Sequence, residues 1–254
     1  RRHRRHRSRM RVTRIFVEQK LVSGKGVGLP EQAGLHLTRV LRLEAGAPVT
    51  LFDGTGGEYE GTLERDGKKI WARVGAHTAF ECESPLRVTL IQGVARGERM
   101  DLIVQKATEL GVTRIVPVFA ERSVVKVDAS KGARKLEHWR SIAISACEQC
   151  GRNRVPDVAE PAPLGDAVRA LEPGSARYLL VAGARETLAA AVRRDAGKPL
   201  VLMIGPEGGL ADAERDFAGA NGFTACAMGP RILRTETAGL AALAIMQTVA
   251  GDFA

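Results

Sequence analysis

Short runs of alternating polar and apolar residues, separated by turn signals, fill the first third of the chain. The turns include Asp53-Gly54 and Asp66-Gly67, dipeptides that favour tight connections between antiparallel strands. We expect strands at residues 13–17, 49–52, 58–63 and 69–74, and a short helix at residues 36–43. This pattern predicts a small β-barrel that ends near Cys82.

The pattern changes after Glu83-Ser-Pro85, which we interpret as a linker. Apolar runs of strand length then alternate with segments whose apolar residues recur at helical spacing. We expect strands at residues 86–91, 113–119, 178–181, 200–204 and 223–228, with helices at 98–110, 131–150, 164–171, 186–194 and 238–250 and another after Gly209. Such alternation predicts a parallel α/β sheet. Pro117 lacks a backbone N–H, which either weakens the strand prediction at 113–119 or places that strand at an edge.

Two loops of unusual composition follow predicted strands in this second part. Gly205-Pro-Glu-Gly-Gly209 follows the strand at 200–204, and a segment with two arginines and Thr-Glu-Thr, residues 228–237, precedes the last helix. Loops at the carboxyl ends of parallel strands commonly bind ligands, and glycines let a ligand approach the backbone. Both loops could equally be ordinary strand-to-helix turns. Thr235 or Thr237 is expected to cap the last helix.

Most of the net positive charge of the chain lies in the first nine residues. The 254-residue chain carries a formal charge of +9, and six arginines with no acidic residue lie within residues 1–9. We expect this tail to be disordered or to precede a true start at Met10, with a nucleic-acid-binding arm as the alternative. No apolar stretch reaches the ~20 residues that a membrane span needs, and no signal-peptide core is present. We therefore expect a cytoplasmic protein without a membrane partner.

The cysteines do not form a recognisable metal motif. Cys147 and Cys150 have the spacing of a ligand pair, but no second Cys or His pair accompanies them. The apolar residues before them recur at helical spacing, which favours a buried helix face. We expect no metal ion.

Several motifs occur together in an order that resembles one known family, the RsmE-type 16S ribosomal RNA (uracil-N3)-methyltransferases of the SPOUT superfamily. They are Arg11-Val-Thr-Arg-Ile-Phe-Val17, His36-Leu-Thr-Arg-Val-Leu-Arg42, Gly97-Glu-Arg-Met-Asp-Leu-Ile-Val-Gln-Lys-Ala-Thr-Glu-Leu-Gly111, Glu121-Arg-Ser-Val124, Ile204-Gly-Pro-Glu-Gly-Gly-Leu210 and Met228-Gly-Pro-Arg-Ile-Leu-Arg-Thr-Glu-Thr-Ala238. The resemblance extends from Met10 to the C-terminus. One departure is Ala211, where the family usually has a Ser or Thr that begins a capping box, so Asp212 is expected to cap that helix instead.

The resemblance implies a fold and a domain organisation. The fold class is α/β, with a basic tail at residues 1–9, a PUA-like RNA-binding β-barrel at residues 10–82 and a SPOUT methyltransferase domain at residues 86–254. It also implies that the C-terminal segment passes through a preceding loop to form a trefoil knot, and that two copies of the chain form a homodimer.

The resemblance further implies S-adenosyl-L-methionine as the cofactor, and N3 of a specific uridine in 16S ribosomal RNA of the small ribosomal subunit as the methylated atom. The expected cofactor-binding residues lie in three loops: Val181, Ala182, Ile204, Gly205, Pro206, Glu207, Gly208, Gly209, Met228, Gly229, Ile232, Leu233 and Thr237. Glu207 could alternatively only order its own loop.

Methylation of uracil N3 requires a group that accepts its proton and a cation that stabilises the developing anion. Arg234 is the first candidate for the cation and Arg231 the second, and Glu236 is a candidate acceptor. Glu236 could equally fix Arg234 or cap the helix. The expected RNA-binding residues are basic or amide side chains from both predicted domains: Arg14, Arg39, Arg42, Arg96, Lys106, Arg122, Asn153 and Arg154. Arg122, Asn153 and Arg154 could equally only form surface salt bridges.

Two other functions fit the same sequence. A SPOUT enzyme that methylates a ribose 2′-hydroxyl would share the cofactor loops, and a non-catalytic RNA-binding assembly factor would share the fold. The intact loops at 205–209 and 231–236 favour an enzyme over the assembly factor. With 4% aromatic residues, a base-stacking surface of the RRM kind is not expected, so charge and shape would contribute more to RNA recognition.

Overall fold

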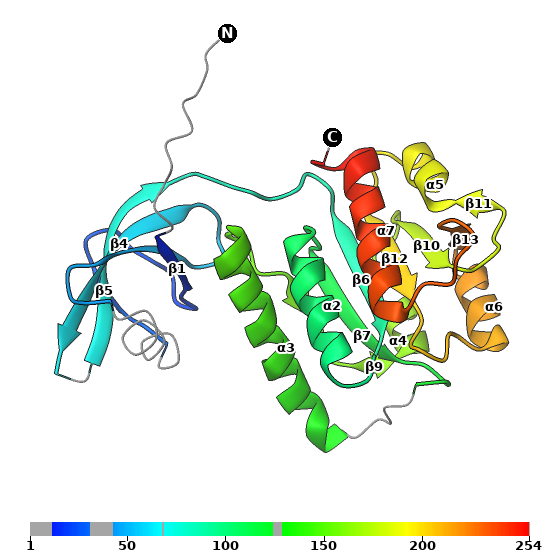
Figure 1. The fold of residues 1–254 in the computed structure, drawn as a ribbon, viewed down its shortest axis with the longest axis horizontal. Coiled ribbons are helices and arrows are strands. Elements are labelled where there is room, and N and C mark those ends of the chain that lie inside the picture. Colours follow the sequence, from blue (N-terminus) through cyan, green and yellow to red (C-terminus); the bar gives the residue numbers. More distant parts are fainter. Residues whose placement is uncertain (1–11, 31–42, 68, 124–128, 254) are drawn as a thin grey trace, which may run out of the picture. The chain divides into compact units, whose positions relative to one another are not determined.

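The computed structural model describes residues 12–30, 43–67, 69–123 and 129–253 (Figure 1). The chain divides into two compact units: unit 1 contains Arg1–Cys82 and Glu148–Arg154, and unit 2 contains Glu83–Cys147 and Val155–Ala254. The expected tail at 1–9, residues 36–42 of the expected helix, and Arg39 and Arg42 lie outside the described residues.

Unit 1 is built on a five-stranded sheet whose order is β1-β3-β4-β5-β2. Its strands are β1 (Thr13–Phe16), β2 (Gly26–Gly28), β3 (Pro48–Phe52), β4 (Glu58–Asp66) and β5 (Lys69–Thr78). β1 pairs with β3 in parallel, and the other pairs are antiparallel. The expected strands are present, and β2 was not predicted. Alternate residues of β5, Ala72 and Val74, join Leu51 and Leu63 in the core, as expected for a sheet with one buried face.

Unit 2 contains an eight-stranded sheet in which every recorded pairing is parallel. Its order is β11-β13-β10-β12-β6-β7-β8, and β9 also pairs with β7. The strands are β6 (Val88–Gly93), β7 (Arg114–Phe119), β8 (Asp157–Val158), β9 (Ala162–Pro163), β10 (Ala176–Leu180), β11 (Glu186–Thr187), β12 (Leu200–Ile204) and β13 (Phe223–Ala227). The predicted parallel α/β sheet is confirmed.

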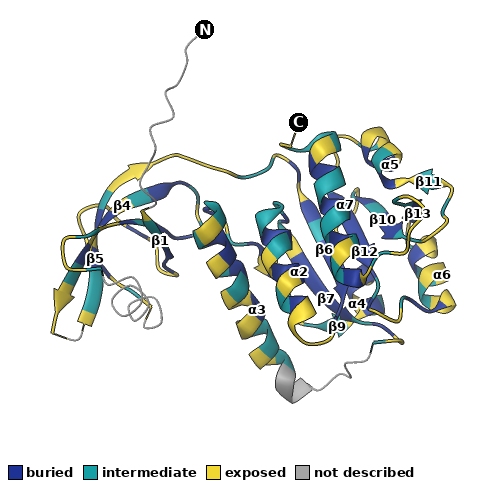
Figure 2. Cartoon of the chain, in the orientation of Figure 1, coloured by how far each residue is buried: buried dark blue, intermediate teal, exposed yellow. Residues whose placement is uncertain are grey.

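Helices connect these strands and cover both faces of the sheet (Figure 1). They are α2 (Glu98–Glu109), α3 (Ala129–Cys150), α4 (Leu164–Arg169), α5 (Leu188–Arg194), α6 (Asp212–Ala220) and α7 (Thr235–Ala250). On one face, Leu200 and Leu202 of β12 share a core with α2, α3, α5 and α7. On the other face, Val201 and Met203 share a core with α4 and α6. Figure 2 shows the central strands as largely buried between these layers.

Pro117 does not mark an edge strand. β7 pairs with β6 along its length, with Pro117 opposite Gln92. On its other side β7 pairs with β8 at Arg114 and Ile115 and with β9 at Val118 and Phe119. Pro117 therefore falls between β8 and β9, and neither of these short strands pairs with it. The prediction of an edge strand was wrong because the neighbouring strand is itself broken at this point.

Candidate functional site

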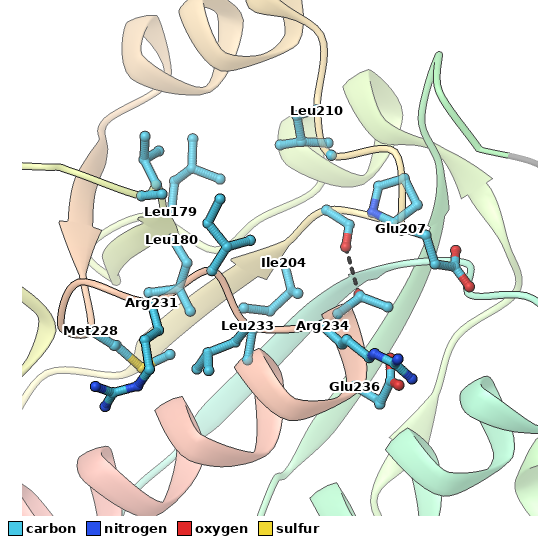
Figure 3. Close-up of a pocket in the computed structure, with 18 of the residues that line it drawn as sticks. Leu179, Leu180, Ile204, Glu207, Leu210, Met228, Arg231, Leu233, Arg234 and Glu236 are labelled. Atoms are coloured by element: carbon cyan, nitrogen blue, oxygen red, sulfur yellow. Dashed lines mark hydrogen bonds between the residues drawn. The ribbon is translucent and has the colours of Figure 1, made fainter.

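A cavity of about 680 Å³ lies in unit 2, at the carboxyl ends of β10, β12 and β13 (Figure 3). This is the edge of a parallel sheet where ligand sites are generally found. Three loops form its wall, and all three follow these strands directly. The lining residues are Arg99, Leu179, Leu180, Val181, Ala182, Ile204, Gly205, Pro206, Glu207, Gly209, Leu210, Arg215, Cys226, Met228, Gly229, Arg231, Ile232, Leu233, Arg234, Thr235, Glu236 and Ala238.

The loop at residues 205–209 is held by close backbone packing. A Cβ at Gly93, the last residue of β6, would lie 2.4 Å from the Pro206 nitrogen, and one at Gly208 would lie 2.9 Å from the Arg122 carbonyl oxygen. Only glycine permits such approaches. Gly209 has a φ of +68°, and no atom stands within 4 Å of the position of its missing Cβ. The loop is thus held by its contacts with Gly93 and Arg122, and its backbone is accessible at Gly209.

A chain of hydrogen bonds ties this loop to the start of α7. The Thr235 hydroxyl donates to the Gly205 carbonyl oxygen at 2.7 Å, and the amide nitrogen of buried Gln92 donates to the same hydroxyl at 2.9 Å. Arg234, not a threonine, occupies the N-cap position of α7, and it makes no side-chain cap. The prediction that Thr235 or Thr237 caps the helix was wrong, because Thr235 is the first helical residue and its hydroxyl is used between loops.

The cap of α6 also differs from expectation. Ala211 is at the N-cap position and Asp212 begins the helix. Glu214 replaces part of the missing cap, because its Oε2 accepts from the Ala211 N–H at 2.9 Å and its Oε1 accepts from the Glu121 N–H at 2.9 Å. This second bond connects α6 to the loop after β7, so the absence of a hydroxyl residue at 211 leaves the helix start anchored.

Charged side chains gather at one end of the cavity. Glu207 Oε1 accepts from the Arg96 N–H and from Arg99 Nη1, each at 2.9 Å. Burial alone would raise the pKa of Glu207, but these two donors together hold it below its ordinary value. Arg99 Nε also lies 3.8 Å from Glu236 Oε1. Figure 3 shows Glu207, Arg234 and Glu236 on the side of the cavity formed by the start of α7.

The opposite wall of the cavity is apolar. Leu179 and Leu180 end β10, Ile204 ends β12, and Met228 and Leu233 come from the loop before α7 (Figure 3). Within the same loop Ile232 is 89% exposed. The site therefore offers an apolar slot next to a charged end, the arrangement of a small-molecule pocket that also contacts a polar substrate.

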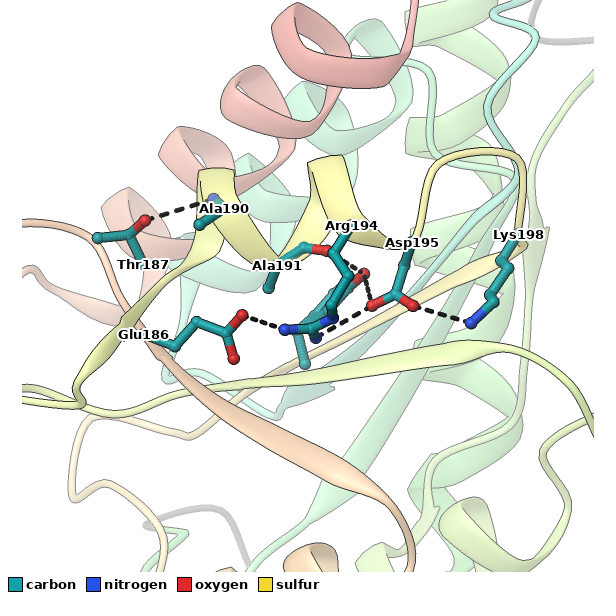
Figure 4. A network of polar contacts seen from close by, with 8 residues as sticks. Glu186, Thr187, Ala190, Ala191, Arg194, Asp195 and Lys198 are labelled. Atoms are coloured by element: carbon teal, nitrogen blue, oxygen red, sulfur yellow. Dashed lines mark hydrogen bonds and ion pairs between the residues drawn. The ribbon is translucent and has the colours of Figure 1, made fainter.

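A polar network supports the strand that carries part of this wall. The hydroxyl of buried Tyr178, in β10, donates to Asp195 Oδ2 at 3.1 Å, and Asp195 accepts from Lys198 at 2.8 Å and from Arg194 at 3.2 Å (Figure 4). Hydrogen bonding by Lys198 is the main cause that lowers the pKa of Asp195, and burial raises that of Tyr178. Arg194 also pairs with Glu186. This network fixes α5 against β10.

Comparisons with known proteins identify the family. A family model described as "RNA methyltransferase domain" matches residues 82–247, and one described as "RNA methyltransferase PUA domain" matches residues 29–75. The chain belongs to this RNA methyltransferase family. "Ribosomal RNA small subunit methyltransferase E" of Bacillus subtilis is 33% identical over 91% of this chain and 94% of its own length, and that of Synechocystis is 36% identical over 84% and 70%.

Solved structures of RNA methyltransferases have the same fold. Ribosomal RNA small subunit methyltransferase E of Neisseria gonorrhoeae, bound to S-adenosyl methionine, matches with a TM-score of 0.88 and 39% identity over 96% of this chain and 100% of that one. A protein of Legionella pneumophila described as a "putative methyltransferase", in complex with the bound cofactor SAM, matches with a TM-score of 0.89 and 37% identity over 95% of this chain and 99% of that one.

The structure of this methyltransferase brings most of the expected site residues together. Of the residues expected to bind the cofactor, all line the cavity except Gly208 and Thr237, and the candidates for catalysis, Arg231, Arg234 and Glu236, line it as well. Residues that sequence reasoning did not select include Arg99, Gln92 and Leu179. Arg99 and Gln92 lie next to the site only through contacts between distant segments, so no local pattern marked them.

The residues expected to bind RNA differ in exposure and in their contacts within the protein. Arg96 and Arg122 are exposed in the loops after β6 and β7, and Lys106 pairs with Glu109 at 2.8 Å along α2. In unit 1, Arg14 is paired with Glu58 and donates to Asn153 Oδ1 at 2.6 Å. Arg14 and the fully buried Asn153 are thus bound to each other inside unit 1, and contact with RNA through either residue stays a prediction.

Arg154 completes this group in unit 1. Its Nε lies 3.7 Å from Glu81 Oε1, and Glu81 also accepts from the Gly57 N–H at 2.8 Å. Arg154 remains half exposed, with 54% of its side chain accessible, so contact with RNA through this residue stays a prediction.

The described residues offer neither a metal centre nor a membrane span. Three or more His, Cys, Asp or Glu side chains suited to hold an ion do not come together among them. In the same part of the chain, none of the helices is both long and apolar enough to cross a bilayer. Burial raises the pKa of the Cys226 thiol to about 11, so this cavity residue stays a protonated, apolar group near neutral pH.

Proposed function

We propose that this chain is an S-adenosylmethionine-dependent enzyme that methylates N3 of a specific uridine in 16S ribosomal RNA of the small ribosomal subunit. The observation that carries the proposal is the cavity at the carboxyl ends of β10, β12 and β13, whose apolar slot lies next to a cluster of arginines and glutamates. Membership of the RNA methyltransferase family supports the reaction, and relatives named for the small-subunit RNA support the substrate.

The residues present suit S-adenosylmethionine. The cavity of about 680 Å³ is within the range of pockets for ligands of this size. Gly209 and Gly229 have positive φ angles with no atom within 4 Å of a Cβ position, so a ligand can approach the backbone of both loops. Leu179, Leu180 and Leu233 would hold the adenine in the apolar slot.

The charged end of the cavity supplies the groups that the reaction needs. The cofactor, when bound, provides a methyl group that N3 takes while the carbon–sulfur bond breaks and its electrons stay on sulfur. The Glu236 carboxylate accepts the proton that leaves N3, and the guanidinium of Arg234 stabilises the negative charge that develops on the uracil oxygens. Arg231 is the second candidate for that cation, and exposed Arg96 and Arg122 contact the RNA phosphates.

The proposal includes a homodimer. α7 is apolar on nearly all sides: besides Leu243 and Met246 in the core, its half-buried residues include Leu240, Ala241, Ala244 and Ile245. A helix that is apolar all round is normally covered on all sides, and a second copy would provide that cover. We place the enzyme in the cytoplasm, where its proposed RNA substrate is found. The trefoil knot stays a prediction.

Transfer of a labelled methyl group from S-adenosylmethionine to small ribosomal subunits that lack the modification tests the proposed function. We expect label in the 16S RNA, with a single-turnover rate that rises with pH until ionisation of N3 no longer limits the reaction. A pH-independent single-turnover rate would contradict the proposed N3 chemistry. Tight cofactor binding without any transfer would contradict the substrate.

A further inference from the structure

Arg99 is a cation at the N-terminal end of a helix, where a positive charge is unfavourable. It lies in the first turn of α2, next to the acidic residues Glu98 and Asp101. The N-terminal end of a helix carries a partial positive charge, so an arginine there is disfavoured unless carboxylates compensate it. Two carboxylates from other segments do so: Glu207, from the loop after β12, and Glu236, from the first turn of α7.

The two carboxylates have different relations to Arg99. Glu207 Oε1 accepts from both Arg99 Nη1 and the Arg96 N–H, each at 2.9 Å. Because one of these donors is backbone, Glu207 is fixed and in turn fixes the guanidinium. Arg99 Nε then faces Glu236 Oε1 at 3.8 Å, an ion-pair contact longer than a hydrogen bond. Glu207 therefore holds Arg99, and Arg99 attracts one oxygen of Glu236.

The second carboxylate oxygen of Glu236 makes no hydrogen bond to the described part of the protein. Oε2 is buried and has no hydrogen-bond partner among the described residues, although buried carboxylate oxygens are normally satisfied. The charged residues near Glu236 are Arg99 from α2, Glu207 from the loop after β12 and Arg234 from the loop before α7, whereas Arg231 lies beside Met228 on the other side of the cavity (Figure 3). Of these, only Arg99 forms a recorded ion pair with it within the described chain.

We propose that Arg99 is a positioning residue for methyl transfer: supported by Glu207, it holds Glu236 Oε1 and so directs Oε2 to receive the N3 proton. This inference rests on the proposed function, and it assigns a role to two residues that do not touch the base. Arg99 acts through Glu236 alone, so removing either residue disables the same step. The effects of the two substitutions should therefore not add.

The test compares Arg99→Met, Arg99→Lys, Glu236→Gln and the double variant Arg99→Met/Glu236→Gln in the full-length protein, with small ribosomal subunits as substrate. General bases contribute roughly 10²- to 10⁴-fold, so we expect Arg99→Met to lower the single-turnover rate about 10- to 100-fold. Arg99→Lys keeps a cation and should recover part of the loss. The double variant should be no slower than Glu236→Gln, and the Kd for S-adenosylmethionine should stay within about threefold of the wild-type value in each case.

Arg87→Met is the matched control, because it removes an exposed ion pair with Glu172 directly before β6, at the end of the sheet away from the cavity. It should leave rate and Kd unchanged. If thermal unfolding shows that Arg99→Met is unstable, the single-turnover rates of Glu207→Gln and Arg99→Lys are compared with that of Glu236→Gln instead.

Three results would overturn the inference. An active wild-type enzyme whose Arg99→Met variant matches Arg87→Met would remove the role of Arg99. Loss of cofactor affinity with an unchanged rate would make Arg99 a cofactor contact, and additive losses in the double variant would show that it acts independently of Glu236. A wild-type enzyme that binds cofactor and transfers no methyl group would instead refute the proposed function, and this inference with it.

Discussion

At the scale of single residues, the site depends on how four arginines are divided between partners. Arg99 is committed to Glu207 and Glu236, and Arg215 is paired with Asp212 on α6. Arg231 and Arg234 also line the cavity, are exposed, and have no recorded ion pair within the described chain. They are therefore the cations available to a ligand, and Arg234 is fixed more closely because it directly precedes α7.

Arg234→Met should reduce methyl transfer much more than cofactor binding. Loss of one preorganised donor at a developing anion typically costs about 10²- to 10³-fold in rate, while the apolar slot that would hold the cofactor is unchanged. Single-turnover rates and calorimetric Kd values measure the two effects separately. Arg231→Met should cost less; if it cost more, Arg231 would be the cation that stabilises the base.

Glu207→Gln should destabilise the protein in a pH-dependent way. Burial opposes ionisation of Glu207, but its hydrogen bonds lower the folded-state pKa below 4.5. Stabilisation by this carboxylate is therefore full above pH 4.5 and is lost as the pH falls through the lower folded-state pKa. Urea unfolding of both proteins at pH 7 and near pH 3 should show a difference that shrinks in acid. If the two free energies of unfolding differed by the same amount at both pH values, the charge of Glu207 would contribute nothing to stability.

At the scale of elements, the site is formed where short connections hold two strand ends together. β6 and β12 are neighbours in the sheet, and Gly93 at the end of one contacts Pro206 after the other. Gln92 and Thr235 add hydrogen bonds from β6 and α7 to this same loop. The loop at 205–209 therefore takes its shape from three elements that are distant in sequence.

Gly93→Ala should distort that loop and weaken cofactor binding. The added methyl group would lie 2.4 Å from the Pro206 nitrogen, and a backbone atom cannot move away as a flexible side chain could. We expect the Kd for S-adenosylmethionine to rise about tenfold or more, equivalent to ~1.4 kcal/mol. Gly219→Ala is the control, since this exposed helical glycine has no atom within 4 Å of its Cβ position. Equal affinities in the two variants would refute the steric account.

Sequence patterns predicted the elements well where the pattern is local. Every described strand of five or more residues was expected, because apolar runs and turn residues define it. β8, β9 and β11 were not, because two residues carry no periodicity and these strands exist only through their pairing. α7 begins at Thr235, earlier than expected, because its polar first turn shows no apolar spacing.

The candidate site was predictable to a similar extent and for similar reasons. Glycines and charged residues after two strands marked both loops, and the loops do line the cavity. The roles of Gln92 and Arg99 depend on partners far along the chain, so they became visible only in the folded protein. Arg14 and Asn153 show the reverse case: residues selected as RNA contacts hydrogen-bond to each other inside unit 1.

At the scale of the whole molecule, unit 2 contains the entire cavity, and α7 runs from that cavity to apolar residues that are only half-buried. Glu236 and Ala238 line the cavity, and Leu240, Ala241 and Ala244 follow along the same helix, half-buried and outside the two cores of the unit. A partner that covers this helix would therefore lie next to the site.

Leu240→Arg should convert the proposed dimer into a monomer. A buried charge without a partner is strongly unfavourable in an apolar interface, while the fold of a single copy would keep this half-buried position hydrated. Sedimentation velocity should give a dimer for the wild-type chain and a monomer for the variant, with far-UV circular dichroism unchanged. A wild-type chain that sediments as a monomer would contradict the dimer.

The identity of the methylated nucleoside decides whether N3 of uridine is the methyl acceptor. Purified protein, S-adenosylmethionine and small ribosomal subunits without the modification are incubated together, and the RNA is digested to nucleosides for mass spectrometry. We expect 3-methyluridine, which should be absent when Arg234→Met replaces the wild-type protein for the same short time. A ribose-methylated nucleoside, or another methylated base, would contradict N3 of uridine as the acceptor.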